Sequence, residues 1–172
     1  MPTVTIFGSH EAKEGGEDYE TGRILGKKLA ESGYTVCNGG YGGIMEATAR
    51  GAKEGRGQTI GVTTEDFGGS ANRWIDQEVK MKKWSDRLFK MIELGDAYVV
   101  FDGGTGTLVE LFVTWEMSNK GFLSKPVVVL GNRWRALTDQ IRKIPQVVDS
   151  PHLYLKKTPA EAVNLLKEKF RV

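Results

Sequence analysis

A glycine-rich segment in the middle of the chain has the residue types and spacing of an anion-binding loop. Its residues are Gly103, Gly104, Thr105, Gly106 and Thr107. It follows the apolar run 97–101, which is typical of a buried strand, and precedes a helical pattern at 108–119. Glycines let backbone N–H groups come close to a ligand. Because a helix N-terminus adds unpaired donors and a positive dipole end, the segment predicts a phosphate site.

A carboxylate lies close to this predicted phosphate site. Glu110 falls in the expected first turn of the helix, where the dipole stabilises an anion. A bound phosphate would repel it, so we expect Glu110 to face a sugar or a water. Alternatively, the segment is only a tight turn whose glycines serve packing. Its glycines fit neither Gly-x-Gly-x-x-Gly nor a Walker A loop with its lysine.

Two further glycine-bearing loops also follow expected strands. Gly8 and Ser9 follow the strand expected at 3–7. The loop after the strand expected at 34–37 contains Gly39, Gly40, Gly42 and Gly43. In parallel α/β sheets, ligands bind beyond the carboxyl ends of the strands. We therefore expect all three loops to lie along one edge of the sheet and to bind the phosphate and the substrate.

Strands and helices alternate along the chain. The expected strands are at 3–7, 34–37, 59–62, 77–81, 97–101, 127–130 and 153–155. The expected helices are at 19–32, 44–53, 83–94, 108–119 and 134–144, with a last helix that starts with Thr158 as N-cap and Pro159 as first residue. This order predicts a doubly wound, mostly parallel, Rossmann-like α/β fold. The length suits a single domain, 1–172, in which 63–76 forms a lid or partner loop.

Composition excludes several classes of protein. A net charge of +2 is too small to indicate a nucleic-acid partner. The single cysteine, Cys37, excludes an internal disulfide and suits the cytoplasm. No apolar run reaches membrane-spanning length, and the N-terminus lacks a signal peptide. With only His10 and His152, no metal cluster is expected.

Several motifs together resemble the LOG ("lonely guy") family, which is often labelled "possible lysine decarboxylase". The hallmark of that family is Pro-Gly-Gly-x-Gly-Thr-x-x-Glu, and 103–107 with Glu110 match all but its first position. The family arginine, fifteen residues before that position, is matched by Arg87, and Met91 also falls in step. Earlier matches are Phe7-Gly8-Ser9, Gly39-Gly40-x-x-Gly43-Ile44-Met45 and Gly61-Val62.

The resemblance implies a Rossmann-like homodimer that needs no cofactor. Family members hydrolyse a nucleoside 5′-monophosphate, of the cytokinin ribotide or AMP type, to free base and ribose 5-phosphate. Arg87 and Glu110 then correspond to the catalytic residues, while the glycine loops and Met91 correspond to substrate-binding positions. Large apolar residues on the expected helices also favour a homodimer: Phe112, Trp115 and Met117.

A sister branch, which includes molybdenum-cofactor carrier proteins that bind without hydrolysis, is resembled by Gly39-Gly40-x-Gly42-Gly43-x-Met45-Glu46, Arg50-Gly51-Ala52 and Ala71-Asn72. Asp102 replaces the family proline, and Leu88, Val109, Asn38 and Glu46 also depart from the LOG pattern. A non-catalytic nucleotide or molybdenum-cofactor carrier is therefore the alternative function. Asp102 could bind a sugar hydroxyl or accept N–H groups of its own turn, and the role of Glu46 stays open.

Cleavage of an N-glycosidic bond passes through an oxocarbenium-like state that a carboxylate can stabilise. Glu110 would take this role, unless it is only a helix-dipole carboxylate. Arg87 would bind phosphate or ribose through its fork of donors, unless it is a solvated helix arginine. Its guanidinium stays protonated, so it cannot act as an acid, and no residue is predicted to protonate the departing base. No lysine has the setting of a pyridoxal-phosphate site, which excludes a lysine decarboxylase.

Overall fold

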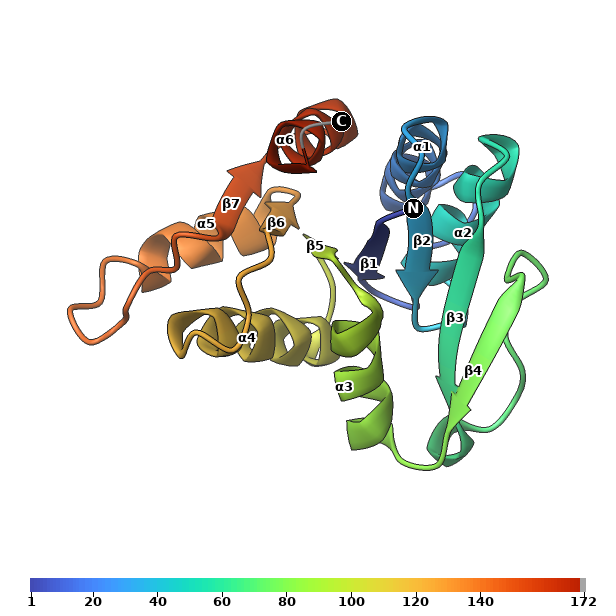
Figure 1. The fold of residues 1–172 in the computed structure, drawn as a ribbon, viewed down its shortest axis with the longest axis horizontal. Coiled ribbons are helices and arrows are strands. Elements are labelled where there is room, and N and C mark those ends of the chain that lie inside the picture. Colours follow the sequence, from blue (N-terminus) through green and yellow to red (C-terminus); the bar gives the residue numbers. More distant parts are fainter. Residues whose placement is uncertain (171–172) are drawn as a thin grey trace.

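The computed structural model describes residues 1–170. Seven parallel strands form one sheet of order β4-β3-β2-β1-β5-β6-β7 (Figure 1). The strands are β1 (Thr3–Phe7), β2 (Thr35–Asn38), β3 (Thr59–Thr64), β4 (Gln77–Met81), β5 (Ala97–Phe101), β6 (Val127–Leu130) and β7 (Leu153–Lys156). The predicted doubly wound α/β fold is confirmed. The order of the strands reverses between β1 and β5, the position at which such sheets bind ligands.

The α-helices match the predicted ones, with shifted ends, whereas the short 3₁₀ helix within 63–76 was not predicted. They are α1 (Glu17–Glu31), α2 (Ile44–Glu54), the short 3₁₀ helix η1 (Glu65–Phe67), α3 (Trp84–Leu94), α4 (Thr105–Asn119), α5 (Arg133–Ile141) and α6 (Pro159–Phe170). The N-cap of α6 is confirmed, since the Thr158 hydroxyl accepts the Glu161 N–H at 3.2 Å. None of the helices within 1–170 has the length and apolar character needed to cross a membrane.

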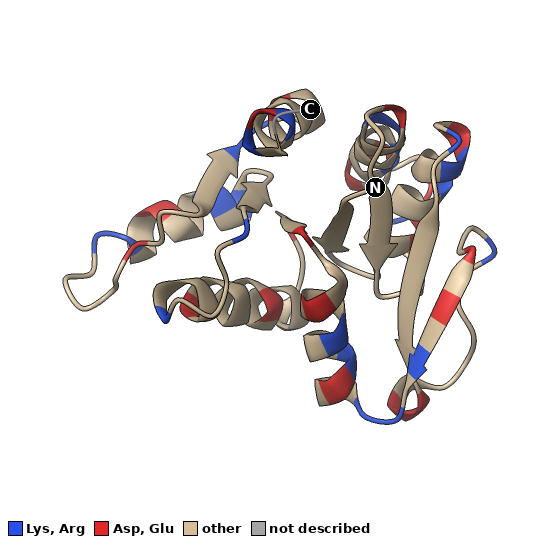
Figure 2. Ribbon diagram, viewed as in Figure 1, with Lys and Arg blue, Asp and Glu red and all other residues tan. Residues whose placement is uncertain are grey.

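The sheet separates two apolar cores. Successive residues of each inner strand point to opposite faces, so Val99 of β5 lies in one core and Val100 in the other. The first core is covered by α1, α2 and α6, and the second by α3, α4 and α5 (Figure 1). Strands β1, β2, β5 and β6 contain no charged residue, as Figure 2 shows, which suits burial on both faces.

Close packing of α1 on α2 depends on glycines. A β-carbon on Gly26 would lie 2.0 Å from the Thr48 carbonyl oxygen, and one on Gly51 would lie 1.9 Å from the Arg23 carbonyl oxygen. The two helix backbones therefore approach too closely for any side chain at these positions. This packing holds α2, and with it the loop between β2 and α2, against the sheet.

We expect Gly26→Ala to destabilise the protein, even though alanine favours a helix. Because the clash is with a backbone atom at 2.0 Å, forcing the helices apart should cost toward the upper end of about 1–3 kcal/mol, more than the propensity gain of about 1 kcal/mol. Urea unfolding followed by circular dichroism measures the change. Gly22→Ala is the matched control, because its β-carbon would meet the nearest atom at 3.3 Å. Equal stability of Gly26→Ala and wild type would contradict this account of the packing.

Candidate functional site

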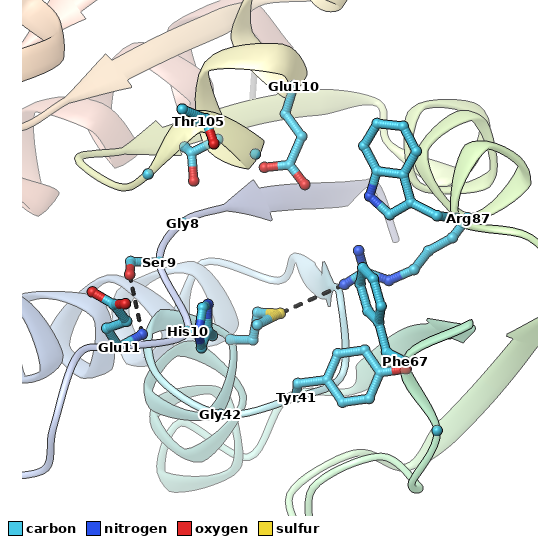
Figure 3. A pocket seen from close by; sticks show the side chains of 16 residues that line it. Gly8, Ser9, His10, Glu11, Tyr41, Gly42, Phe67, Arg87, Thr105 and Glu110 are labelled. Carbon is cyan, nitrogen blue, oxygen red and sulfur yellow. Dashed lines mark hydrogen bonds between the residues drawn. The ribbon is translucent and has the colours of Figure 1, made fainter. Parts of the chain in front are cut away.

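A cavity of about 800 Å³ lies at the carboxyl edge of the sheet, beside the reversal of strand order (Figure 3). Loops after β1, β2, β3 and β5 contribute to it, together with α3 and α4. Its lining residues are Gly8, Ser9, His10, Glu11, Tyr41, Gly42, Met45, Phe67, Gly68, Trp84, Arg87, Gly104, Thr105, Gly106, Thr107 and Glu110. The three predicted loops therefore do meet at one edge.

The N-terminus of α4 opens directly into the cavity. The helix begins at Thr105, three residues earlier than predicted, and no side chain within 1–170 caps it. Its first bond to the preceding turn runs from the Leu108 N–H to the Gly104 carbonyl, at 3.2 Å. The backbone N–H groups of 105–107 are thus available to a ligand. A β-carbon on Gly104 or Gly106 would meet no atom within 4 Å, so the space in front of these amides is open.

Glu110 lies in the second turn of α4, because the helix starts early. The prediction of a first-turn position, and with it the role of a helix-dipole carboxylate, is therefore wrong. The side chain is partly buried and lines the cavity. Burial raises the pKa of its carboxyl group to about 8, although the charge of Arg87 acts in the opposite direction. Glu110 therefore holds a proton at neutral pH when no ligand is bound.

Arg87 is only 6% exposed, so the alternative of a solvated helix arginine is wrong. Its Nε donates to the Val62 carbonyl at 2.7 Å, and its Nη2 donates to the Gly39 carbonyl at 2.9 Å. The fork of donors that was predicted to bind phosphate or ribose thus donates to backbone carbonyls through Nε and Nη2. The remaining nitrogen, Nη1, has no hydrogen-bond partner within 1–170. Burial lowers the pKa of Arg87, while Glu110 acts to raise it.

Arg87 and Glu110 face the same cavity without touching. No ion pair or hydrogen bond joins them in the described part of the chain. Figure 3 shows the two side chains extending from α3 and α4 toward the space between them. A ligand group can therefore lie between the carboxyl and the guanidinium.

Several predicted glycines position the site without lining it. A β-carbon on Gly39 would lie 1.7 Å from Nη2 of Arg87, and one on Gly103 would lie 2.4 Å from the Thr107 hydroxyl oxygen. Gly43 has φ +68°, and its β-carbon would lie 2.3 Å from the Ser9 carbonyl oxygen. That carbonyl accepts the Ile44 N–H at 2.9 Å, which joins the first loop to α2. Gly40 likewise has positive φ and lies outside the cavity lining.

Met91, Asp102 and Asn38 pack or hydrogen-bond within the protein and do not line the cavity. Met91 is 1% exposed in the core between α3 and the sheet, so the prediction that it contacts substrate is corrected: its side chain does not reach the cavity. Asp102 accepts the N–H groups of Asn132, Arg133 and Trp134 at 2.7–3.1 Å, and thus caps α5 instead of its own turn or a sugar. Asn38 donates to the Met45 carbonyl and accepts the Gly40 N–H, which fixes the second loop.

Three aromatic residues that line the cavity were not among the predicted site residues: Tyr41, Phe67 and Trp84. Tyr41 lies within the second glycine loop, and Phe67 lies within 63–76, the segment interpreted as a lid. A position in either loop is only weak evidence that a residue contacts the ligand. Trp84 opens α3, and tryptophans are by default core residues. Within 1–170, no group of three His, Cys, Asp or Glu side chains is arranged to hold a metal ion.

Comparison with known proteins identifies the family. The model of the SLOG cluster4 family matches residues 1–163. The chain belongs to the SLOG cluster4 family. The predicted resemblance to LOG proteins is thereby confirmed, since curated relatives of this SLOG protein carry the name of the LOG activity.

Two curated relatives have modest sequence identity. An Archaeoglobus fulgidus protein, named only as uncharacterized, is 29% identical over 76% of this chain and 85% of its own length. A Rhodococcoides fascians protein named cytokinin riboside 5′-monophosphate phosphoribohydrolase is 28% identical over 76% of this chain and 68% of its own length. Among solved structures, the molybdenum cofactor binding protein from Rippkaea orientalis has a TM-score of 0.78 at 22% identity, covering 98% of this chain and 97% of that one. At this identity the structure shows a shared fold alone.

The raised pKa of Glu110 predicts a pH-dependent stability. The folded protein keeps a proton up to about pH 8, whereas the unfolded chain releases it near 4.5. Stability from this group is therefore fully present below about pH 4.5 and is lost as pH rises through 8. Glu110→Gln lacks this loss, so its free energy of unfolding should rise relative to wild type between pH 5 and 8.

Chemical denaturation at pH 5, 6, 7 and 8 measures this difference. Glu116→Gln, at an exposed position on the same helix, is the control and should track wild type across the series. A constant difference between Glu110→Gln and wild type would mean that the Glu110 carboxyl titrates as an ordinary exposed one.

Proposed function

We propose that the protein is a phosphoribohydrolase that cleaves the N-glycosidic bond of a nucleoside 5′-monophosphate, giving a free base and ribose 5-phosphate. One observation carries the proposal: a carboxyl group whose pKa burial raises to about 8 and a buried guanidinium face the same cavity beside an open helix N-terminus, with no ion pair between them in the described residues. The name of the R. fascians relative supports the same reaction.

The phosphate binds at the N-terminus of α4. The free N–H groups of 105–107 donate to its oxygens, and the dipole of the 15-residue helix favours its charge. Glu110 lies five residues beyond Thr105, which is about 7 Å along the helix axis. That separation suits a ribose, whose anomeric carbon then comes to Glu110 while the 5′-phosphate stays at the helix end.

Glu110 then acts as the acid that the sequence did not identify. As the bond between the anomeric carbon and the base nitrogen breaks, the Glu110 proton goes to that nitrogen and the bonding electrons leave with the base. The resulting carboxylate stabilises the oxocarbenium ion. A water adds to the anomeric carbon and returns its proton to Glu110, which completes hydrolysis.

Arg87 positions the substrate through its remaining donors. Because Nε and Nη2 are held by the Val62 and Gly39 carbonyls, the guanidinium cannot swing away when a ligand leaves. Nη1 is left to donate to a ribose hydroxyl or a phosphate oxygen. Its fixed charge also stabilises Glu110 once the proton has been transferred, since the two groups attract each other as ions.

The decisive experiment is incubation with a panel of nucleoside monophosphates, with assays for free base and ribose 5-phosphate. We expect release by wild type, and a loss of kcat of at least about 100-fold in Glu110→Gln with binding retained. Since the acid must be protonated, kcat/KM should fall as pH rises above 8, where Glu110 loses its proton. If kcat/KM instead rises as pH passes 8, Glu110 acts as an ionised carboxylate from the start of the reaction and not as an acid.

Gly104→Val is the control for the phosphate site. Gly104 has φ −90°, which valine accepts, and its side chain would enter the open space before the helix. We expect this variant to fold and to lose nucleotide binding. A folded Gly104→Val that binds adenosine monophosphate as wild type does would move the phosphate elsewhere.

A second candidate function is a binding or carrier protein for a nucleotide or a molybdenum cofactor. It is favoured by the backbone contacts of Arg87, which make this residue a fixed part of the wall, and by the fold shared with the R. orientalis protein over nearly the full chain. Tight binding across the panel without release of base would select this function over hydrolysis.

We further propose that the protein is a homodimer built on the face formed by α3 and α4. Phe89 on α3 and Val109 and Phe112 on α4 are 55%, 38% and 39% exposed. Trp115 gives no support to this proposal, because it is 3% exposed within the core. Phe112→Glu should convert a dimer to a monomer in light scattering at micromolar concentration, and a monomeric wild type would overturn the proposal.

A further inference from the structure

One wall of the cavity is aromatic. Tyr41, Phe67 and Trp84 line it, and they come from three separate segments: the β2–α2 loop, η1 and the start of α3. Phe67 is 59% exposed and Trp84 is 40% exposed. Large apolar side chains left open to solvent in a cavity indicate a place where a ligand covers them.

The wall is preformed and held by hydrogen bonds. The Tyr41 hydroxyl donates to the Thr64 carbonyl at 3.1 Å and accepts the Thr64 N–H at 2.9 Å, which fixes the ring. The Phe67 ring packs on it, with centroids 6.0 Å apart and planes inclined by 57°. Asp66 accepts the Trp84 N–H at 2.6 Å and so ties η1 to α3. Packing on Tyr41 and the hydrogen bond of the adjacent Asp66 to α3 therefore hold Phe67 at the cavity.

The wall lies at a distance from the phosphate end. Figure 3 shows Tyr41 and Phe67 on the side next to Arg87, away from Thr105. The Arg87 guanidinium lies over both rings, 5.3 Å from the Tyr41 centroid and 5.6 Å from the Phe67 centroid. From Thr105 to Phe67, the lining thus changes from free N–H donors, through Glu110 and Arg87, to aromatic faces.

We propose that Phe67 and Trp84 form the base-binding wall of the site, on which the flat heterocycle of a nucleotide stacks. This assignment rests on the proposed function, because it requires the phosphate at α4. The wall offers stacking faces and few groups that could read a base edge: Phe67 has none, the Tyr41 hydroxyl is already paired with Thr64, and the indole N–H of Trp84 is a single donor. The site therefore selects mainly the size of the ring system, with purine nucleotides bound more tightly than pyrimidine ones.

Phe67 could serve only to shield Arg87 from water, and this role makes a different prediction. Loss of a shield would change the guanidinium and thus weaken every ligand that reaches it, including ribose 5-phosphate. Loss of a stacking surface weakens only ligands that carry a base. Ribose 5-phosphate, which has the phosphate and sugar but no base, therefore separates the two roles.

The test is calorimetric titration of the full chain with adenosine monophosphate, uridine monophosphate and ribose 5-phosphate. Phe67→Ala should weaken adenosine monophosphate binding by about 5- to 150-fold, the range of a lost base–aromatic stack, and leave ribose 5-phosphate unchanged. Phe67→Leu, which keeps an apolar side chain, should fall between. Phe122→Ala removes a phenylalanine that is 77% exposed outside the cavity and should match wild type.

Tryptophan fluorescence supplies a second readout. A stacked purine quenches an indole, so adenosine monophosphate should quench wild type and not Trp84→Phe, while ribose 5-phosphate should quench neither. Equal weakening of both ligands by Phe67→Ala, or no weakening at all, would overturn the assignment. Equal affinity of wild type for ribose 5-phosphate and adenosine monophosphate would also overturn the assignment, because the base would then add nothing to binding. The phosphate site would still stand. If Gly104→Val and wild type both fail to bind any of these ligands, the proposed function itself falls.

Discussion

The site depends on how the buried charge of Arg87 is held. Placing a guanidinium in a protein interior costs free energy unless its N–H groups find acceptors. Here the acceptors are main-chain carbonyls of Val62 and Gly39, which belong to β3 and to the loop after β2. The bonds join two adjacent strand ends to α3, and a β-carbon at Gly39 would occupy the place of the guanidinium. The glycine, the strand ends and the arginine therefore depend on one another.

This arrangement leaves Arg87 without a carboxylate partner in the described part of the chain, and the consequence appears at Glu110. An ion pair would lower the pKa of a carboxyl group. Instead, burial of Glu110 outweighs the attraction of Arg87, and the pKa rises to about 8. With Glu110 neutral, the positive charge of Arg87 and the positive end of the α4 dipole both face the cavity, which suits an anionic ligand. The negative charge on Glu110 appears only after it gives up its proton.

Most of the fold could be predicted because strand and helix patterns depend on local sequence. The apolar runs of β5 and β6 and the N-cap of α6 are contacts between near neighbours in the chain. The roles of Asp102 and Arg87 could not be predicted, since their partners are 25 to 48 residues away. The start of α4 was misplaced because Thr105 and Gly106 are poor helix formers. Tertiary packing made them helical, and that shift moved Glu110 from the first turn to the second.

Because the surroundings of the site depend on distant contacts, sequence motifs alone do not distinguish a hydrolase from a carrier protein. The open N-terminus of α4 and the buried Arg87 serve either function, since both need an anionic ligand held in place. Only a group that can transfer a proton separates them. In this chain the hallmark glutamate is the cavity residue whose pKa is raised to about 8, and the surroundings that raise it come from folding and not from the motif. Departures such as Asp102 and Asn38 do not count against hydrolysis, because the structure assigns them to helix capping and loop geometry outside the cavity lining. The proton that Glu110 can transfer is therefore the feature of the cavity on which the proposed hydrolysis depends.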